Sequence, residues 1–183
     1  SDVEFEVMQR DIERCKQLGC NGVVIGILTA DGRVDKQRCR QLTALAGPMG
    51  VTFHRAFDMT DNPFEALEDI ISIGCERILT SGARNTAVEG MALLKDLVNR
   101  ANDRIAIMAG SGVRAGNIAQ LVKTTGITEY HTTAKGYEDS KMVYRNPDVS
   151  MGGIPGVPEY GISVTQEKEV RLIREIGEKT LLS

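Results

Sequence analysis

Three polar side chains end an apolar run in the first third of the chain. Within the run from Val51 to Asp58, His54, Arg55 and Asp58 stand close together. An unpaired polar group away from water costs several kcal/mol, so these groups either end the strand at a wet site or satisfy one another in a core. We favour the first interpretation, with His54 as general acid or base, Arg55 as an anion clamp and Asp58 orienting either of them. The alternative is an Arg55–Asp58 pair that only fixes the loop after the strand.

A second histidine lies in the last strand pattern of the chain. By the two-residue alternation of a strand, His131 shares a face with Glu129, and we count His131 among the candidate catalytic residues. Imidazole suits copper and zinc, and Asp58 or Glu129 could add an oxygen ligand. His54, His131 and Glu129 are therefore weak candidates for a metal site, and the alternative for His131 is a satisfied core histidine.

A glycine-rich turn provides the candidate anion site. Gly110, Ser111 and Gly112 precede an expected helix, where backbone N–H groups suit a phosphate or a carboxylate. Further residues are expected to border the same solvent-filled opening at the ends of the strands, which we call the mouth: Thr80, Ser81, Gly82 and Lys135. The alternative is a turn with a purely steric role.

The cysteines show no metal-binding spacing. None of the 4 cysteines forms a C-x-x-C motif. Cys20 and Cys75 fall at two similar helix-to-strand joints, on the face opposite the expected mouth, and Cys15 and Cys39 occupy apolar positions of helices. We predict that all of them are small buried hydrophobic residues and not copper ligands.

Helix and strand patterns alternate along most of the chain and would position these residues. Strands are expected at 22–28, 51–57, 77–80, 105–108 and 128–132, and helices at 5–18, 35–46, 61–73, 91–98 and 118–122. Asp35 is the expected N-cap of the second helix, and Pro63 lies in the first turn of the third. The apolar run 22–28 is typical of a parallel strand buried on both faces. The segment 136–164 has no regular pattern and is expected to cover something, before a final helix over 165–182 that packs on the barrel wall or on another subunit.

The fold class follows from the polarity of the strands. A run of parallel strands fits either a doubly wound open sheet or part of a (β/α)8 barrel. Thr52, His54, Thr80, Glu129 and His131 lie inside strand patterns, which a barrel lumen tolerates better than an open sheet covered on both faces. We predict one α/β domain over residues 1–183, a TIM-type barrel with about five strand–helix units that lacks its first three strands. Such an open piece would be a weakly stable monomer or would associate through its edges.

Composition excludes several classes of partner. The formal net charge of −3 gives no electrostatic case for nucleic acid, and no apolar run approaches the roughly 18 residues of a membrane span. The acidic start Ser1-Asp2-Val3-Glu4 is no signal peptide, so reduced cytosolic thiols are expected.

Several motifs together resemble one known family. They are Phe53-His54-Arg55-Ala56-Phe57-Asp58, Ile78-Leu79-Thr80-Ser81-Gly82, the glycine-rich turn after Met108, and Val149-Ser150-Met151-Gly152-Gly153. In this combination the chain is similar to the CutC family of copper homeostasis proteins. The resemblance implies a TIM-like barrel, a cytoplasmic location, self-association into a homo-oligomer, and a part in copper handling with a copper ion as ligand.

The chain departs from the family pattern at three places. The first three strands, with the cysteines usually suggested as copper ligands, are absent. Ala109-Gly110-Ser111-Gly112 stands where the family resembles P-G-G-G, and Thr132 and Thr133 stand where many members have cysteine or serine. Two further hypotheses therefore stay open: a TIM-barrel enzyme for a small phosphorylated or carboxylated metabolite, with His54 moving a proton and the anion at Gly110 to Gly112, and an inactive partner of a full-length form.

Overall fold

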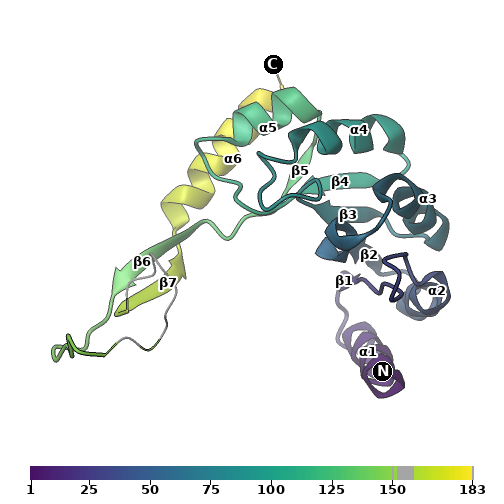
Figure 1. Ribbon diagram of the computed structural model, residues 1–183, viewed down its shortest axis with the longest axis horizontal. Helices are drawn as coiled ribbons and strands as arrows, with labels where there is room; N and C mark the ends of the chain where they lie inside the picture. The colour runs from purple at the N-terminus through teal and green to yellow at the C-terminus, as the bar shows by residue number, and fades with distance from the viewer. Residues whose placement is uncertain (150, 152–158, 183) are drawn as a thin grey trace.

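The computed structural model describes residues 1–149, 151 and 159–182 (Figure 1). Part of the motif 149–153, on which the family resemblance partly rests, lies outside the described residues.

The centre of the fold is one parallel sheet of five strands. Their order in the sheet is the order in the chain: β1 (Gly22–Ile25), β2 (Gly50–Phe53), β3 (Arg77–Thr80), β4 (Ala106–Ala109) and β5 (Glu129–Tyr130). In Figure 1 the helices that connect the strands lie on one side of the sheet, and the other face carries none. This one-sided arrangement agrees with a barrel wall and not with a doubly wound sheet, which has helices on both faces.

The helices begin and end where local chemistry places their caps. They are α1 (Asp2–Gln17), α2 (Lys36–Ala46), α3 (Pro63–Ile73), α4 (Met91–Ala101), α5 (Ile118–Thr125) and α6 (Glu167–Leu181). The predicted N-cap Asp35 accepts a hydrogen bond from the Arg38 N–H, and Asn62 caps α3 with Pro63 in its first turn. A short 3-10 helix, η1 (Arg55–Met59), follows β2.

The hydrophobic core lies between the sheet and its helices. Outward-facing strand residues such as Phe53 and Ile78 are fully buried against helix residues such as Leu67, Ile70 and Leu94. The opposite strand positions, among them Thr52, Leu79 and Met108, are only half-buried and form the bare face. The alternation predicted for a lumen-facing side is therefore visible at Thr52, but Thr80 lies on the buried side of β3 together with Ile78, so its prediction as a lumen-facing position is wrong.

Three strands differ from their predicted form. β1 is an edge strand, and Val24 is 62% exposed, so the prediction of a strand buried on both faces is wrong. β2 ends at Phe53 and not at Phe57, because His54 turns the chain into η1. β5 consists only of Glu129–Tyr130, so His131 follows the strand instead of lying in it.

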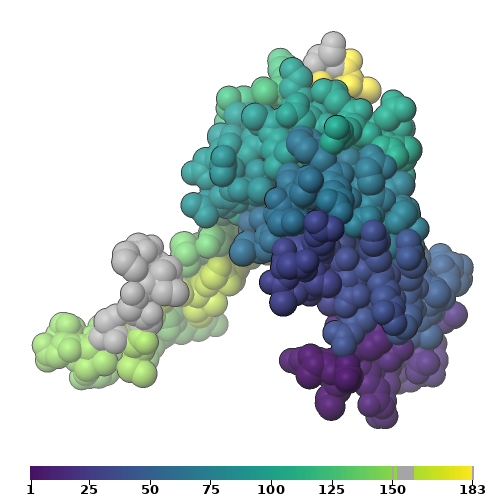
Figure 2. Space-filling model, turned by 45° about the vertical axis from the view of Figure 1, so that its right-hand side comes forward, coloured from purple at the N-terminus to yellow at the C-terminus, as the bar shows by residue number. Residues whose placement is uncertain are grey.

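The segment predicted to be irregular forms an arm. β6 (Lys135–Asp139) pairs antiparallel with β7 (Gly161–Thr165), and the ribbon leads away from the sheet (Figure 1). Figure 2 shows the same arm standing clear of the body of the molecule. The prediction of an irregular covering loop over 136–164 is thus corrected for the described part of the segment, since its two ends are strands that pair with each other.

The last helix returns to the body after the arm. α6 runs beside α5, as Figure 1 shows, and buries Ile173. Gly177 allows close contact with the Tyr130 side chain, because a Cβ there would come within 2.2 Å of the Tyr130 hydroxyl oxygen. Within the described residues, no helix is long and apolar enough to cross a membrane.

Candidate functional site

The loop after β3 wraps around a carboxylate that belongs to the chain itself. Oδ1 of Asp58 accepts hydrogen bonds from the Thr80 hydroxyl and from the N–H groups of Ser81 and Ala83, both at 3.1 Å. Oδ2 accepts from the Ser81 N–H at 3.1 Å and the Ser81 hydroxyl at 3.0 Å. Burial raises the pKa of Asp58, but the hydrogen bonds from Thr80, Arg55, Ala83 and Ser81 outweigh it and hold the pKa below its ordinary value. Asp58 therefore stays ionised in this loop.

The Arg55 side chain lies between this loop and the solvent. Its Nε donates to Asp58 Oδ2 at 2.7 Å and its Nη2 to the Ser81 hydroxyl at 2.8 Å. The Arg55 side chain is 43% exposed, whereas that of Asp58 is 7% exposed. The pair is therefore the loop-fixing pair of the alternative interpretation, but the outer side of the guanidinium remains accessible to a ligand.

A cavity of about 340 Å³ opens beside Arg55 at the carboxyl ends of the strands. Its lining comes from η1, β3, β6 and the loops after β4 and β5, and it includes three cations and a histidine. The lining residues are Arg55, Leu79, Gly110, Ser111, Gly112, Val113, Arg114, His131, Thr132, Thr133 and Lys135. None of these residues is acidic. The cavity brings together Arg55, Gly110 to Gly112, His131 and Lys135 from the sequence prediction, whereas Thr80, Ser81 and Gly82 lie behind it, with the first two holding Asp58.

The glycine-rich turn is fixed by the neighbouring loop. Ser111 has a positive φ of 75°, and its hydroxyl donates to the Asn85 carbonyl at 2.7 Å. The Gly110 N–H donates to the Thr80 carbonyl at 2.9 Å and cannot serve a ligand. In the described part of the chain, the N–H groups of Ser111 and Gly112 have no acceptor. The turn does not stand at a helix N-terminus as expected, because α5 begins only at Ile118.

His131 and Thr132 form the wall that follows β5. The His131 N–H donates to the Ala109 carbonyl at 2.8 Å, which extends the β4–β5 pairing by one residue and leaves the imidazole exposed in the cavity. The Thr132 hydroxyl donates to the Val113 carbonyl at 2.9 Å and accepts from Arg114 at 3.4 Å. Arg114 is a cavity residue that the sequence interpretation missed, although it stands only two positions after Gly112.

His54 does not share the cavity. Its Nδ1 accepts the Ala56 N–H at 3.1 Å and so caps η1, and its ring packs over Gly26, where a Cβ would come within 2.5 Å of the imidazole. His54 follows β2 and His131 follows β5, with β3 and β4 between them in the sheet. The structure therefore does not bring the two histidines together, and a metal site shared by them is not formed in this chain.

Glu129, the third weak metal candidate, is engaged on the bare face of the sheet. Both of its carboxylate oxygens accept from the Arg77 guanidinium, with Nη2 to Oε1 at 3.0 Å, and these hydrogen bonds to Glu129 raise the pKa of Arg77. Arg77 also donates to the Thr52 hydroxyl at 3.3 Å. Among the residues that the structure describes, no group of three or more His, Cys, Asp or Glu side chains could hold a metal ion.

The cysteines divide into a buried and an accessible pair. Cys39 and Cys75 are buried, as predicted, and burial raises their pKa values to about 11 and about 12. Cys20 is exposed and Cys15 is half-buried, so the prediction of small buried residues is wrong for Cys20.

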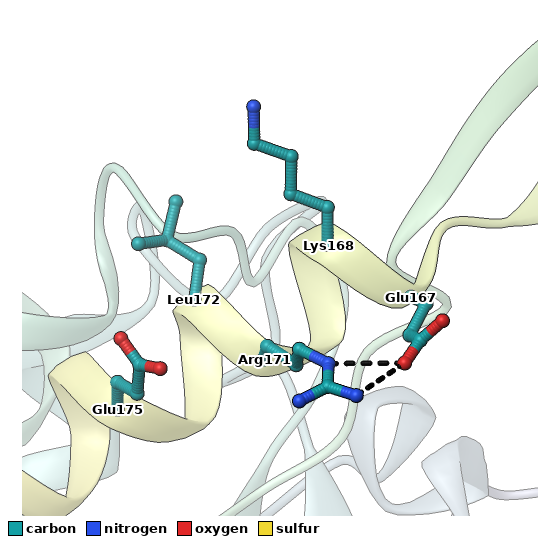
Figure 3. Close-up of a pocket in the computed structure, with 5 residues that line it drawn as sticks. All are labelled: Glu167, Lys168, Arg171, Leu172 and Glu175. Carbon is teal, nitrogen blue, oxygen red and sulfur yellow. Dashed lines mark hydrogen bonds and ion pairs between the residues drawn. The ribbon is translucent and has the colours of Figure 1, made fainter.

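A second hollow, of about 400 Å³, lies on α6 and is no catalytic candidate. Figure 3 shows its five lining side chains on the outer side of this one helix, with Arg171 donating to Glu167. Its charges of both signs lie in or near i,i+4 pairs along an exposed helix, which is an ordinary solvated surface.

Comparisons with known proteins show which proteins this chain is similar to. Residues 1–136 match the CutC family. A family protein CutC of Chromobacterium violaceum is 51% identical over 179 residues, which are 98% of this chain and 72% of that protein. The human copper homeostasis protein cutC homolog is 42% identical over 182 residues, 100% of this chain and 67% of that protein.

Solved structures show the same fold. The crystal structure of the putative copper homeostasis protein CutC from Streptococcus agalactiae superposes with a TM-score of 0.69 at 32% identity, covering 72% of this chain and 64% of that one. A structure titled native KDPGal has a TM-score of 0.58 at 12% identity over 96% of this chain and 66% of that one, which shows likeness of fold alone. The sheet and its helices are thus those of a TIM-type fold.

Proposed function

The chain belongs to the CutC family, and from this premise we propose that the cavity beside Arg55 binds a small phosphorylated or carboxylated metabolite. One observation supports the proposal above others: Arg55, Arg114 and Lys135 border one cavity whose lining contains no acidic residue. Arg55 is partly neutralised by Asp58, but the other two have no carboxylate partner in the described residues. A cavity of one sign of charge concentrates an oppositely charged ligand.

The polar groups divide into binding and proton-handling roles. Guanidinium groups form paired hydrogen bonds with phosphate or carboxylate oxygens, and the N–H groups of Ser111 and Gly112 add uncharged donors. An imidazole readily gives and takes a proton at neutral pH, and His131 is the imidazole that lines this cavity, so an acid/base role falls to His131 and not to His54. We therefore keep the enzyme class considered from the sequence, an enzyme that acts on a small phosphorylated or carboxylated metabolite.

The cavity suits copper poorly. Copper(I) prefers thiolate and thioether ligands, and no cysteine or methionine lines this cavity. The three cations would also repel a metal ion. A role in copper homeostasis, the activity that the names of the mouse and human relatives carry, therefore needs either a different site or an indirect link through the bound metabolite.

We infer further that the sheet is an arc of an eight-stranded barrel and that the protein works in the cytoplasm as a homo-oligomer. The bare face and the open edge at β1 support the barrel, since a lumen is closed by further strands. This chain spans between 64% and 72% of the lengths of the relatives described above. The exposed apolar residues of the arm support self-association.

Binding of inorganic phosphate, followed by the backbone NMR signals of the cavity, tests the proposal. We expect shifts at Ser111 and Gly112, weaker at high salt because the contacts are partly exposed charge pairs. Arg114→Gln and Lys135→Gln should each weaken binding about tenfold, which is the loss of one hydrogen bond to a charged group. Malonate in place of phosphate distinguishes a carboxylate site from a phosphate site.

The control is Lys141→Gln, which removes an exposed cation that does not line the cavity. The proposal is wrong if phosphate and malonate both leave the cavity signals unmoved, or if Lys141→Gln weakens binding as much as Lys135→Gln. Thermal melts of the variants show whether a loss of phosphate binding is instead a loss of folding.

A further inference from the structure

Two cysteines are paired by the cap that ends α1. The Cys20 N–H donates to the Cys15 carbonyl at 3.0 Å, and the Gly19 N–H donates to the Lys16 carbonyl at 3.1 Å. Gly19 has a positive φ of 73°. These are the two hydrogen bonds and the left-handed residue of a Schellman motif, in which the side chains at the first and sixth positions commonly touch. At the end of α1 both of these positions carry a thiol.

This arrangement suits a covalent bond between the two sulfurs. A disulfide needs Cα atoms about 4.4 to 6.8 Å apart and side chains that approach one another. The backbone hydrogen bond between residues 15 and 20 holds them close, and the cap turns both side chains to the same side. Burial raises the pKa of Cys15, and contact with the Cys20 thiol raises it further, so the two sulfurs are neighbours.

The two thiols differ in their access to solvent. Cys20 is exposed and Cys15 is half-buried, so a small reagent reaches Cys20 first. The raised pKa of Cys15 leaves less of that sulfur as thiolate at neutral pH, and it is the thiolate that attacks a disulfide. Cys20 is therefore placed to react with an external disulfide, and Cys15 is placed to resolve the product.

The end of α3 has the same cap without a second thiol. There the Cys75 N–H donates to the Ile70 carbonyl at 3.4 Å, and the Gly74 N–H donates to the Ile71 carbonyl at 3.0 Å. Ile70 and Cys75 are 0% and 5% exposed. The cap of α3 thus places its cysteine beside an isoleucine and away from solvent, which makes Cys75 a matched control.

We propose that Cys15 and Cys20 form a reversible redox couple that exchanges with low-molecular-weight disulfides such as glutathione disulfide. The Cys20 thiolate attacks one sulfur of the small disulfide, which forms a mixed disulfide and releases one small thiol. Cys15 then attacks the Cys20 sulfur, which releases the second small thiol and leaves a bond between Cys15 and Cys20. Two electrons and two protons pass from the cysteines to the small disulfide, and no other oxidant is needed.

The bond would act on a weakly held helix. α1 lies at the β1 edge of the sheet (Figure 1), and Ile12 is its one buried residue. A helix with few buried contacts opens locally at little cost in free energy. A covalent bond across its cap restricts that opening, so the redox state of the couple sets the local stability of the end of α1. This role goes beyond the anion cavity, which lies at the opposite end of the strands, and is independent of it.

Equilibration of the reduced protein in glutathione buffers of increasing oxidation tests the couple. After an acid quench, unfolding and alkylation, we expect the mass of the oxidised chain to show that Cys39 and Cys75 alone carry free thiols. Trypsin cleaves after Lys16, so the disulfide should join the peptide that contains Cys15 to the peptide that contains Cys20. Amide hydrogen exchange in the last turn of α1 should slow on oxidation, and reduced glutathione should reverse both changes.

Single variants separate the two roles. Cys15→Ser should retain glutathione on Cys20 as a stable mixed disulfide, because the resolving thiol is missing. Cys20→Ser should lose the internal disulfide and should not accumulate the mixed disulfide at the half-buried Cys15. Cys75→Ala, from the matching cap of α3, should form the internal disulfide as the native chain does. Melting temperatures of the reduced variants show whether a change in reactivity is instead a change in folding.

Several outcomes would overturn the proposal. They are a native chain that forms no internal disulfide in oxidising buffer, a disulfide that joins Cys20 of two copies, and a Cys15→Ser variant that carries no glutathione. If the variants are unstable, timed alkylation of the folded native chain replaces them. Modification of Cys20 before Cys15 supports the assigned roles, and the reverse order would overturn them.

Discussion

Replacing Asp58 by asparagine tests how the mouth of this fold is held together. The carboxylate receives hydrogen bonds from the hydroxyl of Thr80, from the N–H groups of Ser81 and Ala83, and from Arg55. An amide of the same shape has only one oxygen acceptor and presents an NH2 group where Oδ2 or Oδ1 now accepts. At least one buried donor therefore loses its acceptor, and the charge that Arg55 meets is lost.

The magnitude follows from burial. A hydrogen bond to a charged group contributes about 1.5 to 3 kcal/mol, and a buried donor left unsatisfied costs about 1 to 3 kcal/mol. The Arg55 side chain is 43% exposed and can be solvated again, so the full cost of a stranded buried charge does not apply. We expect Asp58→Asn to lower the free energy of unfolding by about 3 kcal/mol at neutral pH.

Urea unfolding followed by circular dichroism measures this difference at several pH values. The pKa of Asp58 is lowered in the folded state, so its stabilisation is fully present above the ordinary pKa of 3.8 and is lost as the pH falls through the folded value. The gap between the native chain and Asp58→Asn should therefore shrink below pH 3.8. Asp31→Asn, an exposed control, should leave the free energy of unfolding nearly unchanged. A gap below about 1 kcal/mol at neutral pH, or one that does not shrink in acid, would refute the reasoning.

Two further predictions concern backbone packing and the arm. Gly82→Ala should destabilise the fold by about 3 kcal/mol or more, because φ is positive and the new Cβ would lie 2.3 Å from the Gly90 carbonyl oxygen. Gly110→Ala should destabilise it by only about 1 kcal/mol, because the new Cβ meets the flexible end of the Leu79 side chain. Equal losses of stability in thermal melts of the two variants would contradict this. Val143 is 94% exposed on the arm, so Val143→Glu should weaken self-association without changing the melting temperature. If the native chain sediments as a monomer at every concentration, the proposed role of the arm is wrong.

Much of the fold follows from periodicity and cap residues in the sequence. The strand Arg77–Thr80 was predicted with its observed bounds, and the cap at Asp35 was predicted correctly. Strand polarity also indicated the bare face of the sheet, because Thr52 alternates with the buried Val51 and Phe53. These features depend on neighbours in the chain, which a single sequence displays.

The strand ends were harder to predict because they depend on single hydrogen bonds. β2 ends at Phe53 because the His54 imidazole accepts the Ala56 N–H and starts η1, although the apolar pattern continues to Phe57. The arm was missed for a related reason. Its strands β6 and β7 are mostly exposed, and their apolar alternation is limited to Ile162 and Val164.

The assignment of the loop after β3 shows why residue types alone mispredict a site. A threonine, a serine and a glycine after a parallel strand are typical of an anion-binding loop, and the loop does bind an anion. That anion is the carboxylate of Asp58, which the chain supplies from η1, so the donors of Thr80 and Ser81 are already satisfied. The hydrogen bond to Asp58 also positions Arg55, so that one side of its guanidinium contacts Asp58 and the other faces the cavity. A free anion can therefore be held by the cations that have no carboxylate partner in the described residues, Arg114 and Lys135, by the turn at Gly112, and by the outer side of Arg55.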